Sequence, residues 1–296
     1  MSSMPKSCIA PLTNAGTKPV KRASGLMWLL PVLGLLTMFF VVPILIFLLR
    51  SFMDPQLGLQ NYRELIGSWT YAKVILNTFT VASLVTVVTV LIGFPVAWLL
   101  AILPRGWEKV LMSILLLSMW TNLLVRTYAW MVLLQRTGFI NQLLVKWGLI
   151  DTPLALVNNL TGVTIGMTYI MLPFLVLPLH ATLKAIDPIT LRAATICGAS
   201  QWQTFWRILL PLAAPGLASG ALMVFVMSLG YFVTPALLGG TNNMMLAELI
   251  AQLVQSLLNW GLGGAAALLL MLVTLGLYTL QLRLYGSAQG KRTVAA

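Results

Sequence analysis

Long apolar stretches dominate the chain, and short polar segments separate them. Residues 26–49 contain no charged side chain, and residues 74–104 contain none either. A run of about 20 apolar residues is long enough to cross a bilayer as a helix. Four further apolar stretches lie at about 110–134, 160–183, 212–237 and 261–281. The pattern therefore predicts an all-α integral membrane protein with six transmembrane helices.

The polar segments predict how the chain is divided. Residues 1–25 are basic and contain several prolines, and we expect a disordered tail there. Residues 26–285 form the expected six-helix membrane domain, and residues 286–296 form a second tail. A cleaved signal peptide is the alternative for the first apolar stretch, but the stretch is too long and no small-x-small cleavage site follows it. Residues 244–258 are amphipathic and predict an external or re-entrant helix.

Composition narrows the class of protein and its orientation. The chain of 296 residues is 59% hydrophobic and only 8% charged, and a soluble domain with so few charges would expose a large apolar surface. The net charge is +12, but no basic stripe on a soluble module accompanies it, which argues against a nucleic-acid partner. With the N-terminus inside, twelve of the 18 Lys and Arg residues fall in cytoplasmic segments and five in outer ones. Because basic residues collect on the cytoplasmic side, we expect both termini there.

Residues 187–215 are the longest polar interruption in the second half of the chain, and they predict two short helices around a turn. Asp187 is a good N-cap residue, and Pro188 fits the first helical position, where its missing N–H is not needed. Gly198 can adopt the left-handed conformation that ends a helix. Three residues before it are spaced to share one helix face: Leu191, Ala194 and Thr195.

The spacing within this segment resembles the cytoplasmic EAA loop of ABC-importer permeases. Ala193-Ala194 is followed after three residues by Gly198, and after nine more by Ile208-x-Leu210-Pro211. The resemblance implies the type I importer (MetI-like) permease fold, with residues 187–211 as the coupling loop that docks on an ATPase. Arg192 stands where the family has a glutamate, which reverses the charge. The residues implied in ATPase coupling are Asp187, Leu191, Arg192, Ala193, Ala194, Gly198, Ile208 and Pro211.

Further stretches resemble the spermidine/putrescine branch of these permeases. They are Asn77-Thr78 and residues 93–101, 124–134, 138–141, 172–178 and 230–240. The resemblance implies a multi-pass transport subunit of a bacterial inner membrane, not an enzyme, that passes a polyamine inward by alternating access. It implies four partners: membrane lipid, a second homologous permease, an ABC ATPase dimer and a periplasmic solute-binding protein. ATP and Mg belong on that ATPase, and no cofactor is expected on this chain.

Several polar and aromatic side chains are candidates for the substrate path: Asn77, Trp120, Arg126, Trp130, Tyr231 and Glu248. Arg126 lies inside the predicted third span, where a charge is costly and usually functional. It is also about 24 Å from the inner surface, at 1.5 Å per residue, and so close enough to the outer interface to snorkel. His180 is expected to be a hydrogen-bonded packing residue, because metal sites need several donors. The sequence contains no catalytic constellation, metal-ligand cluster or Walker A motif.

Other functions make different demands on the sequence. The same machinery could carry another small solute, such as an amino acid or a related organic ion. An ion-gradient carrier would need acids or a proton relay within the membrane, and none of the six acidic residues lies in a predicted span. An integral-membrane enzyme would need clustered catalytic side chains, which the sequence lacks.

Overall fold

The computed structural model describes residues 30–54 and 56–293, without the side chains of residues 241 and 281–293. All regular structure in these residues is helical, which confirms the predicted all-α class. Five helices are long and apolar enough to cross a membrane, and a bent pair makes a sixth if it is counted as one span. The five are Leu30–Met53, Trp69–Ile102 (α4), Leu160–Lys184 (α8), Gln201–Leu229 and Trp260–Leu280. The predicted tail of residues 1–25 lies outside the described residues.

The remaining named elements form parts of these spans, extend them or connect them. They are η1 (Thr37–Val41), α2 (Val42–Met53), α3 (Gln60–Gly67), α5 (Arg105–Trp120), α6 (Leu123–Leu134), α7 (Phe139–Lys146), α9 (Pro188–Ile196), α10 (Gln201–Thr204), η2 (Phe205–Leu209), α11 (Leu210–Leu229), α12 (Val233–Leu238), η3 (Thr241–Asn243), α13 (Leu246–Gln255) and α14 (Trp260–Thr293). Helix α13 is the amphipathic helix that the sequence predicts between the last two spans. The backbone of α14 continues as a helix to Thr293, through most of the segment expected to be a tail.

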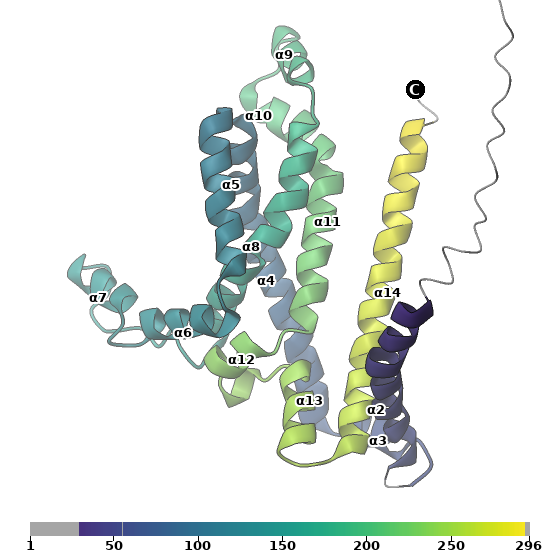
Figure 1. The fold of residues 1–296 in the computed structure, drawn as a ribbon. Helices are drawn as coiled ribbons and strands as arrows, with labels where there is room; N and C mark the ends of the chain where they lie inside the picture. Colours follow the sequence, from purple (N-terminus) through teal and green to yellow (C-terminus); the bar gives the residue numbers. More distant parts are fainter. Residues whose placement is uncertain (1–29, 55, 294–296) are drawn as a thin grey trace, which may run out of the picture. The chain divides into compact units, whose positions relative to one another are not determined.

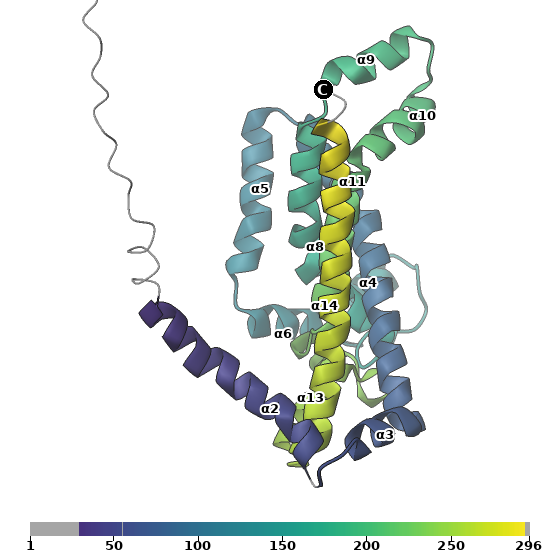
Figure 2. The ribbon, with the colours of Figure 1, turned by 90° about the vertical axis from the view of Figure 1, so that its right-hand side faces the viewer.

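The contacts divide the chain into two units, Met1–Ile46 and Phe47–Ala296, which are described separately. In the first unit, residues 30–46 form an apolar helix that includes the π-helical turn η1. In the second unit, α4, α8 and α11 pack against one another and form the core (Figures 1 and 2). Helices α9 and α10 lie at one end of this unit, and α3 and α13 lie at the other.

Close helix approach in the core depends on small residues. Leu175 of α8 is fully buried between α4 and α11, where Gly93 and Gly220 face it. A Cβ atom on Gly220 would lie 2.9 Å from the Leu175 Cδ1 atom and 3.0 Å from its carbonyl oxygen. Small residues at such contacts let helix backbones pack closely in a membrane, where no hydrophobic effect drives association. The three core helices are therefore held in a fixed arrangement from which the ends of the unit project.

The third span predicted at 110–134 is not one straight helix, and the six predicted spans are reached when the bent pair is counted as one. The chain bends by 101° between α5 and α6. Thr121 and Asn122 have extended backbone conformations, and the Asn122 side chain accepts a hydrogen bond from the Leu124 N–H at 2.8 Å as the N-cap of α6. Two polar residues that can satisfy helix ends are enough to break an apolar run. The estimate that placed Arg126 near the outer interface assumed a straight helix from residue 110, and it does not apply to this bent segment.

The predicted fifth span, 212–237, is also shifted. The observed helix starts at Gln201, within the elbow, and ends at Leu229. Gly230–Phe232 are not helical, and α12 then begins at Val233 with Pro235 in its first turn. Proline is tolerated there because the first turn has no intrahelical partner for its missing N–H. In contrast, α8 stays helical through Pro173 and Pro178.

Candidate functional sites

The elbow consists of α9, the turn that follows it and α10, and it has the two-helix form that the sequence predicts. The Asp187 carboxylate accepts a hydrogen bond from the Ile189 N–H at 2.8 Å, so Asp187 is the N-cap of α9. Gly198 has φ +82°, the left-handed conformation expected for it. The Gly198 N–H donates to the Thr195 carbonyl oxygen, and the Ala199 N–H donates to that of Ala194. This pair of bonds is the Schellman motif, in which a left-handed glycine ends a helix.

A capping box starts the second helix of the elbow. The Ser200 hydroxyl accepts from the Gln203 N–H at 3.2 Å, and the Gln203 side chain accepts from the Ser200 N–H at 3.1 Å. The signal Ser-x-x-Gln is visible in the sequence. Both helix ends at the turn are thus satisfied by their own residues, so the elbow holds its shape through local hydrogen bonds.

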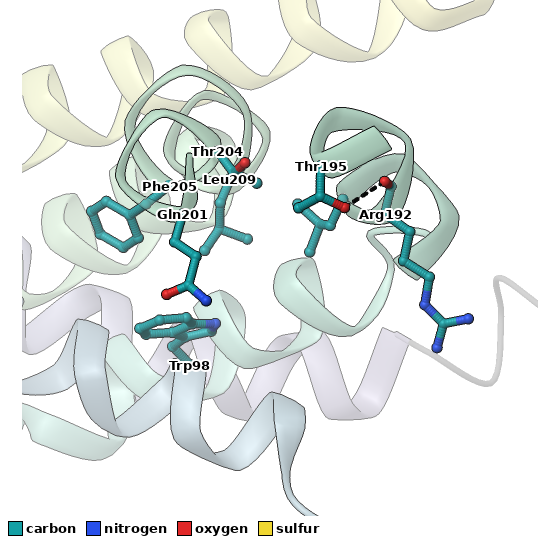
Figure 3. A pocket seen from close by; sticks show the side chains of 8 residues that line it. Trp98, Arg192, Thr195, Gln201, Thr204, Phe205 and Leu209 are labelled. Carbon is teal, nitrogen blue, oxygen red and sulfur yellow. Dashed lines mark hydrogen bonds between the residues drawn. The ribbon is translucent and has the colours of Figure 1, made fainter. Parts of the chain in front are cut away.

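A hollow of about 440 Å³ separates α9 from α10 and the end of α4 (Figure 3). Trp98 of α4 faces Gln201 and Phe205 from below, and the Arg192 side chain extends away from them. The Trp98 and Phe205 rings are 5.7 Å apart. No local sequence pattern indicates this aromatic contact, because Trp98 in α4 and Phe205 in η2 are about a hundred residues apart. The hollow is lined by Trp98, Leu191, Arg192, Thr195, Gln201, Thr204, Phe205 and Leu209.

The eight predicted coupling residues divide into four pairs. Leu191 and Ala194 pack toward the core, whereas Arg192 and Ala193 are exposed. Asp187 and Gly198 define the two ends of α9. Ile208 and Pro211 are not part of the elbow: Ile208 belongs to the π-helical turn η2, and Pro211 lies in the first turn of α11.

An ionic cluster joins α5 to α8. The Lys184 ammonium donates to the Glu108 Oε2 atom at 2.7 Å, and the His180 Nε2 atom lies 3.1 Å from Oε1 without the alignment of a hydrogen bond. Helix α5 begins at Arg105, so Glu108 lies in the first turn of the bent pair, two residues before the predicted start of the third span. The His180 side chain is only 13% exposed, as expected for packing, but its neighbour is a charged group that the sequence did not indicate.

Three of the predicted substrate-path residues lie around the contact between α6, α8 and α12. Trp130 and Tyr231 both pack against the buried cluster around Met167. The Arg126 Nε atom is buried and has no hydrogen-bond partner among the described residues. Burial raises the pKa of Tyr231, and the Arg126 guanidinium and a hydrogen bond with Thr234 partly oppose this. A cation and two aromatic side chains are therefore gathered at this contact.

The other three candidates lie elsewhere. Asn77 donates to the Asn242 carbonyl oxygen at 3.0 Å, and its neighbour Thr78 accepts from the Leu246 N–H at 2.8 Å. These bonds place the start of α13, which carries Glu248, beside α4. Trp120 is 88% exposed at the end of α5. The contacts thus divide the sequence candidates into two groups and one exposed side chain. Among the described residues, no group of three or more His, Cys, Asp or Glu side chains could hold a metal ion.

Comparison with known proteins identifies the family. Residues 24–285 match the family described as "Binding-protein-dependent transport system inner membrane component". The chain belongs to this family. It is therefore a permease subunit of an ABC importer, as the elbow motif indicates, and proteins of this kind are not enzymes and carry no cofactor themselves.

Curated relatives agree with this assignment. The spermidine/putrescine transport system permease protein PotB of Escherichia coli (strain K12) is 34% identical over 250 residues, which cover 82% of this chain and 90% of that protein. The PotB protein of Haemophilus influenzae is 31% identical over 79% of this chain and 84% of that protein. The putative 2-aminoethylphosphonate transport system permease protein PhnU of Salmonella typhimurium is 25% identical over 93% of this chain and 97% of that protein.

Solved structures confirm the predicted importer fold. A bacterial ABC transporter involved in the import of the acidic polysaccharide alginate has a chain that matches with a TM-score of 0.67 and 19% identity. The match covers 88% of this chain and 96% of that one. In a second structure, in complex with an alginate pentasaccharide-bound periplasmic protein, the TM-score is 0.70 at the same identity, over 88% and 93%. At 19% identity the likeness bears on the fold alone.

Proposed function

We propose that this permease passes a polyamine, such as spermidine or putrescine, from a periplasmic binding protein into the cytoplasm. The observation that carries the proposal is the 34% identity with PotB over 82% of the chain. It extends over the core helices as well as the elbow, so it is not limited to the motif that all ABC-importer permeases share. The proposed location is a bacterial inner membrane.

The elbow is the proposed coupling element. It projects from one end of the unit formed by residues 47–296 (Figures 1 and 2), and its second helix continues without a break into the span that ends at Leu229. A push on α10 is therefore transmitted along a continuous helix to Gly230 and α12. On this proposal, ATP binding closes an ATPase dimer, the elbow follows it, and the bundle changes between inward- and outward-facing forms.

The proposed assembly contains a second homologous permease, the ATPase dimer with its ATP and Mg, and the binding protein. The elbow and both termini lie in the cytoplasm, which follows from the distribution of Lys and Arg along the sequence. Cys197 lies exposed in the elbow and can test this orientation. In a Cys8→Ser background, Cys197 should resist a membrane-impermeant thiol reagent in intact cells and react in inside-out vesicles. Labelling in intact cells would reverse the orientation.

Uptake by a reconstituted transporter tests the choice of solute. The permease, its genetic neighbours for the second permease and ATPase, and the binding protein would be combined in proteoliposomes. We expect ATP-dependent uptake of labelled spermidine or putrescine, and loss of uptake when the binding protein is omitted. If the vesicles hydrolyse ATP when loaded binding protein is added but take up neither spermidine nor putrescine in a saturable way, the polyamine proposal is wrong.

One structural observation favours a second candidate, a small solute with an anionic group. The Arg126 guanidinium has a buried Nε atom without a hydrogen-bond partner, and no carboxylate of the described residues forms an ion pair with it. The 25% identity with PhnU extends over 93% of the chain, and an aminophosphonate carries a negative group that an arginine binds well. Competition of 2-aminoethylphosphonate against polyamine uptake in the same vesicles distinguishes the two solutes.

A further inference from the structure

Helix α9 exposes an apolar stripe with one cation in it. Ile189 is 68% exposed and Ile196 is 86% exposed, and Arg192 and Ala193 lie exposed between them. The spacing i, i+3, i+4, i+7 places these four residues on one face. The opposite face carries Leu191 and Ala194, which pack toward the core. Both of these faces of the helix are therefore apolar, and one of them is exposed.

The helix has the features of an element that inserts into a groove. Recognition of a helix by a groove uses anchor residues at i, i+3, i+4 and i+7. Asp187 and the Schellman motif at Gly198 satisfy backbone hydrogen-bonding groups at the two ends of the helix. A groove therefore has mainly the side chains of the exposed face to bind. Burial of an isoleucine side chain is among the larger apolar contributions to binding, so two such residues are expected to contribute strongly to docking.

Arg192 determines the chemistry of the groove. Among the described residues, both ion pairs within 4 Å involve Glu108. No carboxylate of these residues therefore lies within 4 Å of the Arg192 guanidinium. Burying a guanidinium between two isoleucines without an opposite charge would be costly. A carboxylate satisfies it through two parallel hydrogen bonds, which a lysine could not make in the same way.

We infer that the groove of the partner ATPase that receives α9 carries an Asp or Glu opposite Arg192, between two apolar pockets for Ile189 and Ile196. At 1.5 Å per residue the two pockets are about 10 Å apart, and the carboxylate lies between them. This inference rests on the proposed coupling function of the elbow. It adds which face of α9 docks and the charge that its partner presents.

Capture of the co-expressed ATPase by the tagged permease tests the inference in the assembled complex. Arg192→Glu should lower ATPase retention at least tenfold, and Arg192→Lys should lower it less. Arg207→Glu is the matched control, because it makes the same charge change at another exposed position, in η2 just after the elbow. Ile196→Asp should also release the ATPase. Membrane levels of each variant confirm that it folds.

The outcomes separate the inference from the proposed function. If Ile196→Asp leaves the ATPase bound, α9 is not the docking element and the coupling proposal fails. If Ile196→Asp releases the ATPase but Arg192→Glu behaves like Arg207→Glu, only the inferred carboxylate is wrong. If Ile196→Asp releases the second permease and not the ATPase, the face packs on that permease, which also overturns the inference.

A charge exchange identifies the acid itself. Each Asp and Glu of the ATPase would be changed in turn to Arg and paired with Arg192→Glu. One such pair should restore retention to within about threefold of the native complex, while the same ATPase variant with native Arg192 binds poorly. Failure of every pair to restore binding overturns the inference.

Discussion

Glu248 is a half-buried carboxylate in the first turn of α13, and its Oε2 atom has no hydrogen-bond partner among the described residues. Burial raises the pKa of this carboxyl group above its ordinary value, and the Met245 N–H partly opposes the shift. A raised pKa means that the unfolded chain loses this proton at a lower pH than the folded protein does. The group therefore destabilises the fold as the pH rises through and beyond the ordinary value near 4.5.

Replacing this carboxylate should make the protein less sensitive to pH. Glu248→Gln keeps an oxygen that can accept from the Met245 N–H but cannot ionise. We expect the variant to melt at a higher temperature than the native protein at pH 7.5, and the difference to vanish near pH 4. Thermal unfolding in detergent at several pH values measures this. The exposed Glu64→Gln is the control for an equal change of charge, and an equal rise in that variant would contradict the role of burial.

Gly198 is a second residue whose backbone determines a local structure. A side chain meets no other group there, but φ is +82°. The left-handed conformation costs a residue with a Cβ atom about 1–2 kcal/mol, and a β-branched one more. The expected effect of substitution is thus conformational strain and not a steric clash with the core.

A β-branched residue at this turn should uncouple transport while leaving the membrane domain intact. Gly198→Val should reach the membrane at native levels but retain less ATPase and support several-fold lower uptake. Gly198→Asn should be close to native, because asparagine tolerates the left-handed region. If the valine variant transports normally, the turn is not needed for coupling, and if the asparagine variant fails equally, strain is not the cause.

Among the helices, those that cross the membrane were predictable because an apolar run of sufficient length is a property of the sequence alone. The break at Thr121-Asn122 was not, since two polar residues barely change the hydropathy of a 25-residue window. The elbow could be predicted in detail because caps and turns depend on neighbouring residues such as Asp187 and Ser200. The pairing of Glu108 with Lys184 joins residues 76 positions apart, which no local pattern reveals.

That pairing is expected to hold α5 against α8. None of the residues of α5 is fully buried, although Met112 and Leu115 pack against the core, so the bond between Glu108 and Lys184 adds to a limited apolar contact. Glu108→Gln removes the charge, and since Lys184 is 38% exposed, solvent screens the pair and its loss should destabilise the protein only slightly.

The consequence for stability can be measured directly. Glu108→Gln should lower the melting temperature slightly, and a disulfide between cysteines introduced into α5 and α8 should form more slowly. His180→Gln is the matched comparison and should have the smaller effect, because the His180 Nε2 atom is not aligned as a hydrogen bond to Glu108. A larger effect from His180→Gln would assign the attachment to the histidine.

For the whole molecule, the question is which subunit selects the solute. The described part of this chain brings Arg126 next to Trp130 and Tyr231, and places Glu248 near Asn77 in a separate region. A site that selects a polyamine needs carboxylates together with aromatic faces. Among the described residues no carboxylate forms an ion pair with Arg126, so this group of side chains is by itself an incomplete site for a polycation.

Because this group of side chains is an incomplete polyamine site, we expect the external binding protein to select the solute. The path through this subunit is then only weakly selective. Arg126→Ala and Glu248→Gln should change the uptake rate several-fold and leave the order of preference among spermidine, putrescine and 2-aminoethylphosphonate unchanged. Competition assays in proteoliposomes with one binding protein measure this order. Arg126→Lys keeps the positive charge and separates an electrostatic effect on rate from a loss of packing. If either Arg126→Ala or Glu248→Gln reverses the order of preference with the same binding protein, this subunit itself selects the solute. In that case the partner permease need not supply further acidic residues.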